Sequence, residues 1–247
     1  MDEIKKLKSE NESLKKMIES KSDILSTTSH KIRTTLTALK WTLRMFLNKD
    51  LGEITDEQKK YLEKLIENNE KSLSLINYVL VSNHTGEIKE SINLSKIDIL
   101  NLLEKIIFIF SGEIKNKNIN LIFNKEDSEH LEVKCDEDMI TSVFENLVEN
   151  AIKYSHNNGE IIIRIKKDEK ENGILVSIED NGIGIKEDDA SKVFGKFFRA
   201  PNAIEKENTG SGLGLFTTKS LVDKNKGKIW FESKKEGTTF FVLLPID

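Results

Sequence analysis

The chain has 247 residues, of which 37% are hydrophobic and 32% are charged, so it can bury the core of one large or two modest globular units. Its formal net charge of -4 excludes the basic excess of proteins that bind nucleic acid or membrane surfaces, and its one cysteine, Cys135, excludes an internal disulfide. Because it has neither a signal peptide nor an apolar run of about 18 residues, we expect a cytoplasmic chain without membrane contact, although the soluble core of a membrane receptor would look the same.

Residues 1–22 predict a coiled coil. Apolar side chains alternate between the a and d positions of a heptad, and Asn11 occupies an a position among charged and small polar residues. A lone polar a residue typically specifies two strands, so we expect a parallel dimer, with a solvated single helix as the alternative. The apolar positions are Ile4, Leu7, Leu14, Ile18 and Leu25.

Residues 23–87 predict a domain built on a helical hairpin. Its first helix ends near residues 48–54, and Thr55 with Gln58 forms a capping box that opens a second helix. The a/d spacing of that helix predicts an antiparallel hairpin over residues 23–84, and two hairpins of a homodimer would form a four-helix bundle. The a/d positions are Leu62, Leu65, Asn69, Leu73, Ile76 and Leu80.

The first helix of this hairpin carries one histidine in the stretch TTSHKIRTTLTALKW. His30, Thr34, Thr37 and Trp41 share one face of the helix, and the apolar residues form another. We therefore expect the His30 side chain to point away from the core. The apolar stripe consists of Leu25, Ile32, Leu36, Leu39, Leu43 and Phe46.

Residues 88–247 predict an α+β sandwich, in which one mixed sheet has its helices on one face. A helix over about residues 96–115 is expected first. The tract 199–211 is polar and too long for a tight turn, so it is a candidate lid. Strands are expected at 119–123, 131–135, 160–166, 174–180, 228–233 and 238–244, and further helices at 137–155 and 213–225.

The helix at 137–155 carries polar residues where helix propensity gives no reason for them. Asn146, Asn150 and Lys153 lie on one face, next to a stripe of apolar residues. An amide oxygen can coordinate Mg²⁺ and a lysine can meet phosphate, although a solvated polar face explains the pattern equally well. The apolar stripe consists of Ile140, Phe144, Leu147 and Ala151.

Asp180 stands at the end of the strand 174–180, and Gly182 and Gly184 follow in the next turn. The carboxylate could accept a hydrogen bond from the exocyclic amine of a base, while the glycines let a flat base approach the backbone. A simple Asn-Gly turn is the competing interpretation.

A second glycine-rich stretch, TGSGLGLFTTKS, predicts an anion site. Gly210, Gly212 and Gly214 stand at the opening of a helix, where free N–H groups and the helix dipole attract phosphate. A dinucleotide fingerprint is rejected, because it would lie between the strand and the helix of a first βαβ unit.

Between the two glycine stretches lies VFGKFFRA. Its three aromatic residues, Phe194, Phe197 and Phe198, are interpreted as core and hinge residues. Arg199, which follows them, is our candidate for a catalytic residue.

Taken in order, these stretches resemble the bacterial sensor histidine kinases over essentially the whole chain. SHKIRTTLT is similar to the H box, NLVENAIKY to the N box, DNGIGI to the G1 box, FGKFFR to the F box and GSGLGL to the G2 box. The resemblance implies a homodimeric hairpin bundle, an ATP-binding domain of the GHKL (Bergerat, Hsp90-like) type, and a response-regulator receiver domain as partner.

It also implies roles for individual residues. His30 would accept the phosphoryl group from ATP and pass it to a receiver aspartate, Asn150 would hold Mg²⁺, and Asp180 would bind adenine. The residues expected around the phosphates are Asn146, Lys153, Tyr154, Gly210, Ser211, Gly212, Leu213, Gly214 and Leu215.

The sequence departs from the H-box pattern at two positions. Lys31 stands where the family has an acidic residue, and Thr35 stands where it has a proline, which removes a helix kink. Thr34 is retained, at a position that in the family helps to orient water for dephosphorylation. We therefore expect a histidine kinase with phosphatase activity, whose autophosphorylation is weakened by Lys31.

Two other functions remain open. A hydrolase of the same nucleotide-binding fold would need a carboxylate one turn before Asn150, where this chain has the amide of Asn146. A catalytically silent dimeric module that binds nucleotide and a receiver domain is the second alternative, which Lys31 keeps open.

Overall fold

A computed structural model of the chain describes residues 2–82, 93–125, 131–207 and 210–246. For parts of the first two helices, His30 included, only the backbone is described. The chain divides into two compact units, residues 1–91 and 92–247. No helix among the described residues is both long and apolar enough to cross a membrane.

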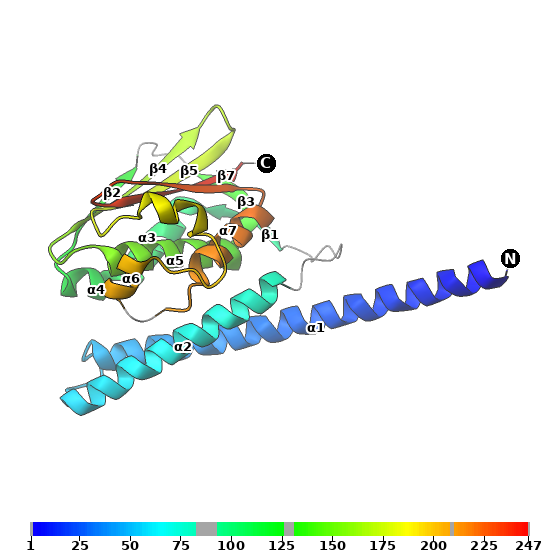
Figure 1. The fold of residues 1–247 in the computed structure, drawn as a ribbon, viewed down its shortest axis with the longest axis horizontal. Coiled ribbons are helices and arrows are strands. Elements are labelled where there is room, and N and C mark those ends of the chain that lie inside the picture. The colour runs from blue at the N-terminus through cyan, green and yellow to red at the C-terminus, as the bar shows by residue number, and fades with distance from the viewer. Residues whose placement is uncertain (1, 83–92, 126–130, 208–209, 247) are drawn as a thin grey trace. The chain divides into compact units, whose positions relative to one another are not determined.

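The first unit is the predicted helical hairpin. Helix α1 (Asp2–Leu47) is continuous, and α2 (Asp56–Ser82) runs back along its C-terminal part (Figure 1). The capping box is confirmed, because Thr55 N donates to Gln58 Oε1 at 2.8 Å and Gln58 N donates to Thr55 Oγ1 at 3.2 Å. Gly52, with a φ of 113°, supports the turn between the helices.

The interior of the hairpin is only partly apolar. Leu43 is buried, and so is Asn69, whose Nδ2 donates to the carbonyl oxygen of Leu36 at 2.9 Å. Other predicted seam residues stay exposed in the single hairpin, because two helices cannot cover the whole stripe. These are Ile32, Leu39, Phe46 and Leu65.

The second unit is built on a five-stranded mixed sheet in the order β2-β4-β5-β7-β6. Strands β2 and β4 are parallel, whereas the other neighbours are antiparallel. The helices gather on one face of the sheet (Figure 1), as predicted. The strands are β2 (Asn120–Lys125), β4 (Glu160–Asp168), β5 (Gly173–Asp180), β6 (Lys228–Ser233) and β7 (Thr238–Pro245).

The helix predicted over residues 96–115 is wrong at its start. Strand β1 (Leu94–Asp98) comes first and pairs antiparallel with β3 (Glu132–Asp136) in a separate two-stranded sheet. Helices α3 (Ile99–Ile109) and α4 (Ser111–Asn116) follow. Because the partner of β1 lies over 30 residues further along the chain, no local pattern predicts its pairing.

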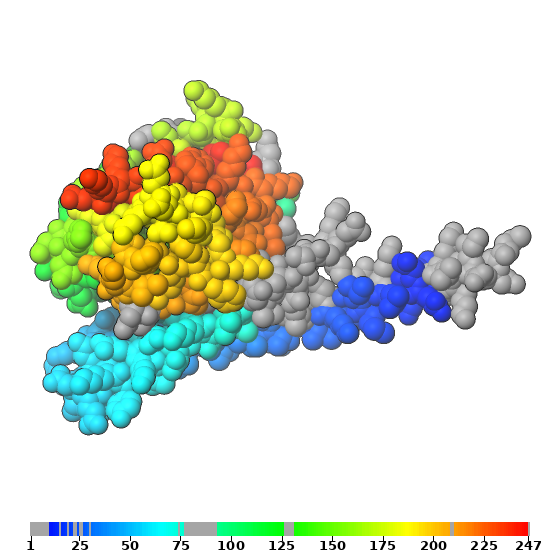
Figure 2. All heavy atoms as spheres, in the orientation of Figure 1, coloured from blue at the N-terminus to red at the C-terminus, as the bar shows by residue number. Residues whose placement is uncertain are grey.

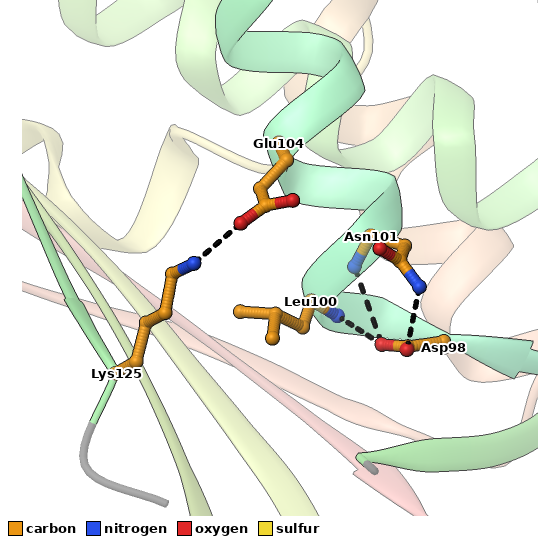
Figure 3. Close-up of polar contacts among 5 residues, drawn as sticks. All are labelled: Asp98, Leu100, Asn101, Glu104 and Lys125. Carbon is orange, nitrogen blue, oxygen red and sulfur yellow. Dashed lines mark hydrogen bonds and ion pairs between the residues drawn. The ribbon is translucent and has the colours of Figure 1, made fainter. Parts of the chain in front are cut away.

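Asp98 marks the boundary between β1 and α3 (Figure 3). Its Oδ1 accepts hydrogen bonds from Leu100 N at 2.9 Å and Asn101 N at 3.2 Å, which satisfies N–H groups that the first turn of a helix leaves free. An ion pair between Lys125 and Glu104 joins the end of β2 to α3.

Helices α5 (Glu137–Tyr154) and α7 (Gly214–Lys224) confirm two of the predicted helices. The candidate lid is more structured than predicted, because α6 (Pro201–Lys206) lies within it and the short helix η1 (Glu187–Lys192) precedes it. The buried stripe of α5 is as predicted: Ile140, Phe144, Leu147 and Ala151.

Candidate functional site

Asp180, the last residue of β5, is a buried carboxylate. Only 7% of its surface is exposed, and its Oδ1 accepts a hydrogen bond from Gly182 N at 2.8 Å. Burial raises the pKa of Asp180 to about 6, although hydrogen bonds from the backbone N–H groups of Gly182 and Thr238 partly oppose this shift. At neutral pH the residue is therefore a largely ionised hydrogen-bond acceptor inside the fold.

The glycines after Asp180 are required by the protein's own backbone. A Cβ on Gly182 would lie 2.2 Å from the carbonyl oxygen of Tyr154, and one on Gly184 would lie 2.4 Å from that of Lys234. Gly184 also has a φ of 62°. The close approach that the glycines allow is thus to the end of α5 and to the β6–β7 connection.

The N-box residues lie on a half-buried face of α5. Asn146 Nδ2 donates to Thr218 Oγ1 on α7 at 2.8 Å, and a Cβ on Gly214 would lie 2.5 Å from Asn146 Oδ1. Asn146 therefore fixes α5 against the start of α7. Asn150 offers an amide oxygen, a ligand type that suits Mg²⁺, which usually takes one or two ligands from protein and the others from phosphate and water.

Residues that are distant in sequence meet at the C-terminal end of α5. A Cβ built on Gly210 would lie 3.6 Å from Arg199 Nε and 3.7 Å from Lys153 Nζ. Burial raises the pKa of Tyr154, whereas the charge of Arg199 and its side-chain hydrogen bond to Tyr154 partly oppose this shift. Two cationic side chains thus lie beside the glycine-rich loop, an arrangement that would suit phosphate groups.

The loop that opens α7 is packed against the F box. Gly212 has a φ of 69°, and a Cβ there would lie 2.6 Å from the carbonyl carbon of Phe197. Ser211 Oγ accepts a hydrogen bond from Leu213 N at 3.2 Å. The Leu213 side chain is fully buried and therefore packs in the core of the domain. Among the described residues, no side chain caps the N-terminus of α7, where Leu215 is half-buried, and such a helix start offers N–H groups to an anion.

The core interpretation of the F-box aromatics is wrong for Phe197. The residue is 62% exposed and its φ is 60°, because the chain turns sharply there. Phe194 is half-buried and its ring centroid lies 6.0 Å from that of Phe231, which fits a packing role. Phe198 is also half-buried.

Two site residues escaped the sequence patterns. Lys117 Nζ donates to the carbonyl oxygens of Ile152 at 2.8 Å and Lys153 at 3.0 Å, and so caps the C-terminus of α5. Burial lowers the pKa of Lys117, as does the charge of Lys206. Asn202, in the lid tract, contacts the turn after Asp180. No local signal could have found either residue, because each acts on backbone that is distant in sequence.

The backbone of His30 lies within α1, and its side chain lies outside the described part of the chain, so its predicted orientation remains a prediction. Lys31 and Thr34 are exposed. Thr35 Oγ1 donates to the carbonyl oxygen of Lys31 at 3.0 Å, within a helix that continues to Leu47. The hydroxyl thus supports the turn at the position where the family pattern has a proline.

Both units match known protein families. Residues 20–84 match the His Kinase A (phospho-acceptor) domain, and residues 135–247 match the histidine kinase-, DNA gyrase B- and HSP90-like ATPase family. The sensor histidine kinase WalK of Bacillus subtilis is 32% identical over 231 residues, which cover 93% of this chain and 37% of the relative. The sensor protein RprX of Bacteroides fragilis is 27% identical over 94% of this chain and 45% of the relative.

Solved structures show the same folds. The nucleotide-free catalytic domain of histidine kinase ThkA has a TM-score of 0.55 and 29% identity, covering 62% of this chain and 96% of that one. The complex of ThkA with the response regulator TrrA has a TM-score of 0.60 and 24% identity, covering 91% of this chain and 61% of that one. At this identity the match shows a similar fold. The chain spans less than half the length of the curated relatives WalK and RprX.

Proposed function

The chain belongs to the sensor histidine kinases, with a phospho-acceptor domain followed by an ATPase domain, and from this premise we propose that it is an ATP-dependent protein histidine kinase. In this proposal His30 receives the γ-phosphoryl group of ATP and passes it to an aspartate in the receiver domain of a response regulator. The match of residues 20–84 to a phospho-acceptor domain, with His30 inside it, is the observation that carries the proposal.

The geometry of the second unit supports ATP as the phosphoryl donor. Asp180 is a buried acceptor suited to the exocyclic amine of adenine, and Lys153 and Arg199 flank a glycine-rich loop suited to phosphates. We propose that Asn150 contributes one oxygen to a Mg²⁺ ion, which would neutralise phosphate charge when bound. In the transfer, an imidazole nitrogen of His30 forms the N–P bond while the bond to the ADP oxygen breaks.

We further propose that the chain acts as a homodimer. The exposed apolar residues Ile32, Leu39, Phe46 and Leu65 form part of a stripe that one hairpin cannot bury, and a second copy would complete a four-helix bundle. The heptads of residues 1–22 would extend the dimer as a coiled coil.

Lys31 and Thr34 set the proposed balance of activities. A lysine cannot take the proton of the attacking imidazole, so we propose slow autophosphorylation. Thr34 keeps its hydroxyl next to the phosphorylation site, which supports dephosphorylation of the receiver.

The silent module of the same fold remains the second candidate, because Lys31 removes the base that the family pattern supplies. Hydrolase chemistry fits less well. Asn146, which occupies the place of the catalytic carboxylate, is an amide whose nitrogen is bonded to Thr218 and which cannot act as a base.

Incubation of the full chain with γ-labelled ATP and Mg²⁺ tests the proposal. We expect protein-bound label that is acid-labile and base-stable, and we expect none in a His30→Gln variant. Nucleotide binding without any such label would favour the silent module, and release of phosphate from ATP with an unlabelled protein would favour the hydrolase.

A further inference from the structure

Asn202, a side chain of the lid tract, is fastened to the turn that follows Asp180. Its Nδ2 donates hydrogen bonds to the carbonyl oxygens of Gly184 at 3.0 Å and Ile183 at 3.3 Å. Its Oδ1 is buried without a hydrogen-bond partner among the described residues. Burying an acceptor without a partner costs free energy. The two hydrogen bonds from Nδ2 to the turn offset this cost and hold the amide in its orientation.

The other contacts of this turn come from the body of the domain. Ile183 N donates to the carbonyl oxygen of Tyr154 at 3.3 Å, and Ile185 N donates to Ser233 Oγ at 2.7 Å. These bonds attach the turn to α5 and to the end of β6. The bonds of Asn202 attach the same turn to α6, a surface helix within the yellow and orange region of Figure 2.

The same short helix is also held near the proposed phosphate site. Arg199 Nη2 donates to the carbonyl oxygens of Ala203, at 3.4 Å, and of Glu207. Gly210 and Lys153 lie beside this arginine. Because α6 has only six residues, fewer than two turns, a shift at Asn202 moves the carbonyl groups that hold Arg199.

We propose that Asn202 is a positioning residue that couples recognition of the adenine base to the placement of Arg199. It holds the turn after Asp180 in the shape that receives the base, and through α6 it holds Arg199 beside the phosphates. The inference rests on the proposed kinase function and adds to it a residue that touches neither the base nor the phosphates.

Calorimetry on the full chain tests the coupling with two ligands, adenosine, which has no phosphates, and a non-hydrolysable ATP analogue with Mg²⁺. Asn202→Asp keeps the size of the side chain but turns an acceptor toward the two carbonyl groups, so it should weaken adenosine binding about tenfold. It should weaken the ATP analogue by a larger factor, because Arg199 is displaced as well. Arg199→Lys should weaken the ATP analogue much more than adenosine, which has no phosphates for the cation to contact.

The double variant separates coupling from two independent effects. If Asn202 acts partly through Arg199, the loss of ATP-analogue affinity in Asn202→Asp with Arg199→Lys is smaller than the product of the single losses. Losses that multiply would overturn the coupling. Asn202→Ala provides a second variant without a carboxylate, with the same expected pattern.

Ile204→Ala is the matched control, since Ile204 lies on the same helix and is 47% exposed. We expect parental binding of both ligands. An equal loss of binding in Ile204→Ala would assign the effect to α6 as a whole. Parental adenosine binding by Asn202→Asp would show that the amide does not position the turn. Either result overturns the inference. A parent chain that binds no nucleotide would instead overturn the proposed kinase function, on which this inference rests.

Discussion

At the scale of single residues, we predict that the buried carboxylate of Asp180 links nucleotide binding to stability. Asp180→Asn replaces an acceptor by a donor toward the adenine amine, and we expect it to weaken adenosine binding by roughly 1–3 kcal/mol. The same change removes a buried charge, so the variant without nucleotide should unfold at no lower temperature than the parent. Calorimetry and thermal unfolding measure the two effects, and unchanged adenosine affinity would contradict the adenine assignment.

The pKa of Asp180 predicts a pH dependence with a definite sign. Because the folded-state pKa is raised from 3.8 to about 6, the folded chain takes up this proton first as the pH falls. This group's contribution to stability therefore grows as the pH falls from 7 toward 4, whereas adenosine binding weakens as the acceptor is neutralised near pH 6. Binding isotherms at several pH values should show the second trend in the parent and not in Asp180→Asn.

Lys31 is the residue that we expect to limit autophosphorylation. A carboxylate next to His30 would orient the imidazole and take its proton, an effect typically of about 10²–10⁴-fold. Lys31→Glu should therefore raise the initial rate of His30 labelling at saturating ATP by about 10²-fold, and the proposed phosphatase activity through Thr34 should be largely kept. A parent chain that is already as fast as the variant would show that the missing carboxylate does not limit the rate.

At the scale of elements, the lid tract 199–211 combines one short helix with polar flanking chain. Pro201 begins α6, and Asn202 and Arg199 hold it through a few hydrogen bonds, with little apolar burial. Such segments open at low free-energy cost. Hydrogen exchange in the tract should slow on addition of a non-hydrolysable ATP analogue, while α5 is already protected without it. Unchanged exchange in the tract would exclude a lid that closes on nucleotide.

At the scale of the whole molecule, the exposed seam residues of the hairpin predict a dimer. Leu39→Asp places a charge on the apolar stripe, where Leu39 is 47% exposed in the single hairpin. We expect light scattering to show a dimeric parent and a variant of half its mass. Lys60→Asp, a charge change at an exposed position of α2, should stay dimeric. A monomeric parent would contradict the bundle.

The receiver domain is expected to dock on the hairpin beyond His30. Trp41 is half-buried, with the guanidinium of Arg44 5.8 Å from its ring centroid, and it shares the face predicted for His30. A partly exposed aromatic ring is a good interface anchor. Trp41→Ala should reduce phosphotransfer to a receiver while sparing labelling of His30. Equal loss of both would instead assign Trp41 to the packing of the hairpin.

Local patterns were sufficient for much of this protein. The capping box of Thr55 and Gln58, the buried stripe of α5 and the ordered boxes from His30 to Leu215 follow from residue types at short spacings, because helix starts and apolar faces depend on neighbours within one or two turns. The order of these boxes also predicts the family, which the matches to two domain families confirm.

The tertiary structure decided what depends on distant partners. Strand β1 was missed because it pairs with β3, beyond the reach of any local pattern, and Phe197 is exposed because the chain turns there to meet Gly212. Lys117 and Asn202 act on backbone carbonyl groups far along the chain, which any donor of suitable reach could satisfy. Residue type and spacing therefore specify the elements and the family, whereas contacts between elements specify which side chains position the site.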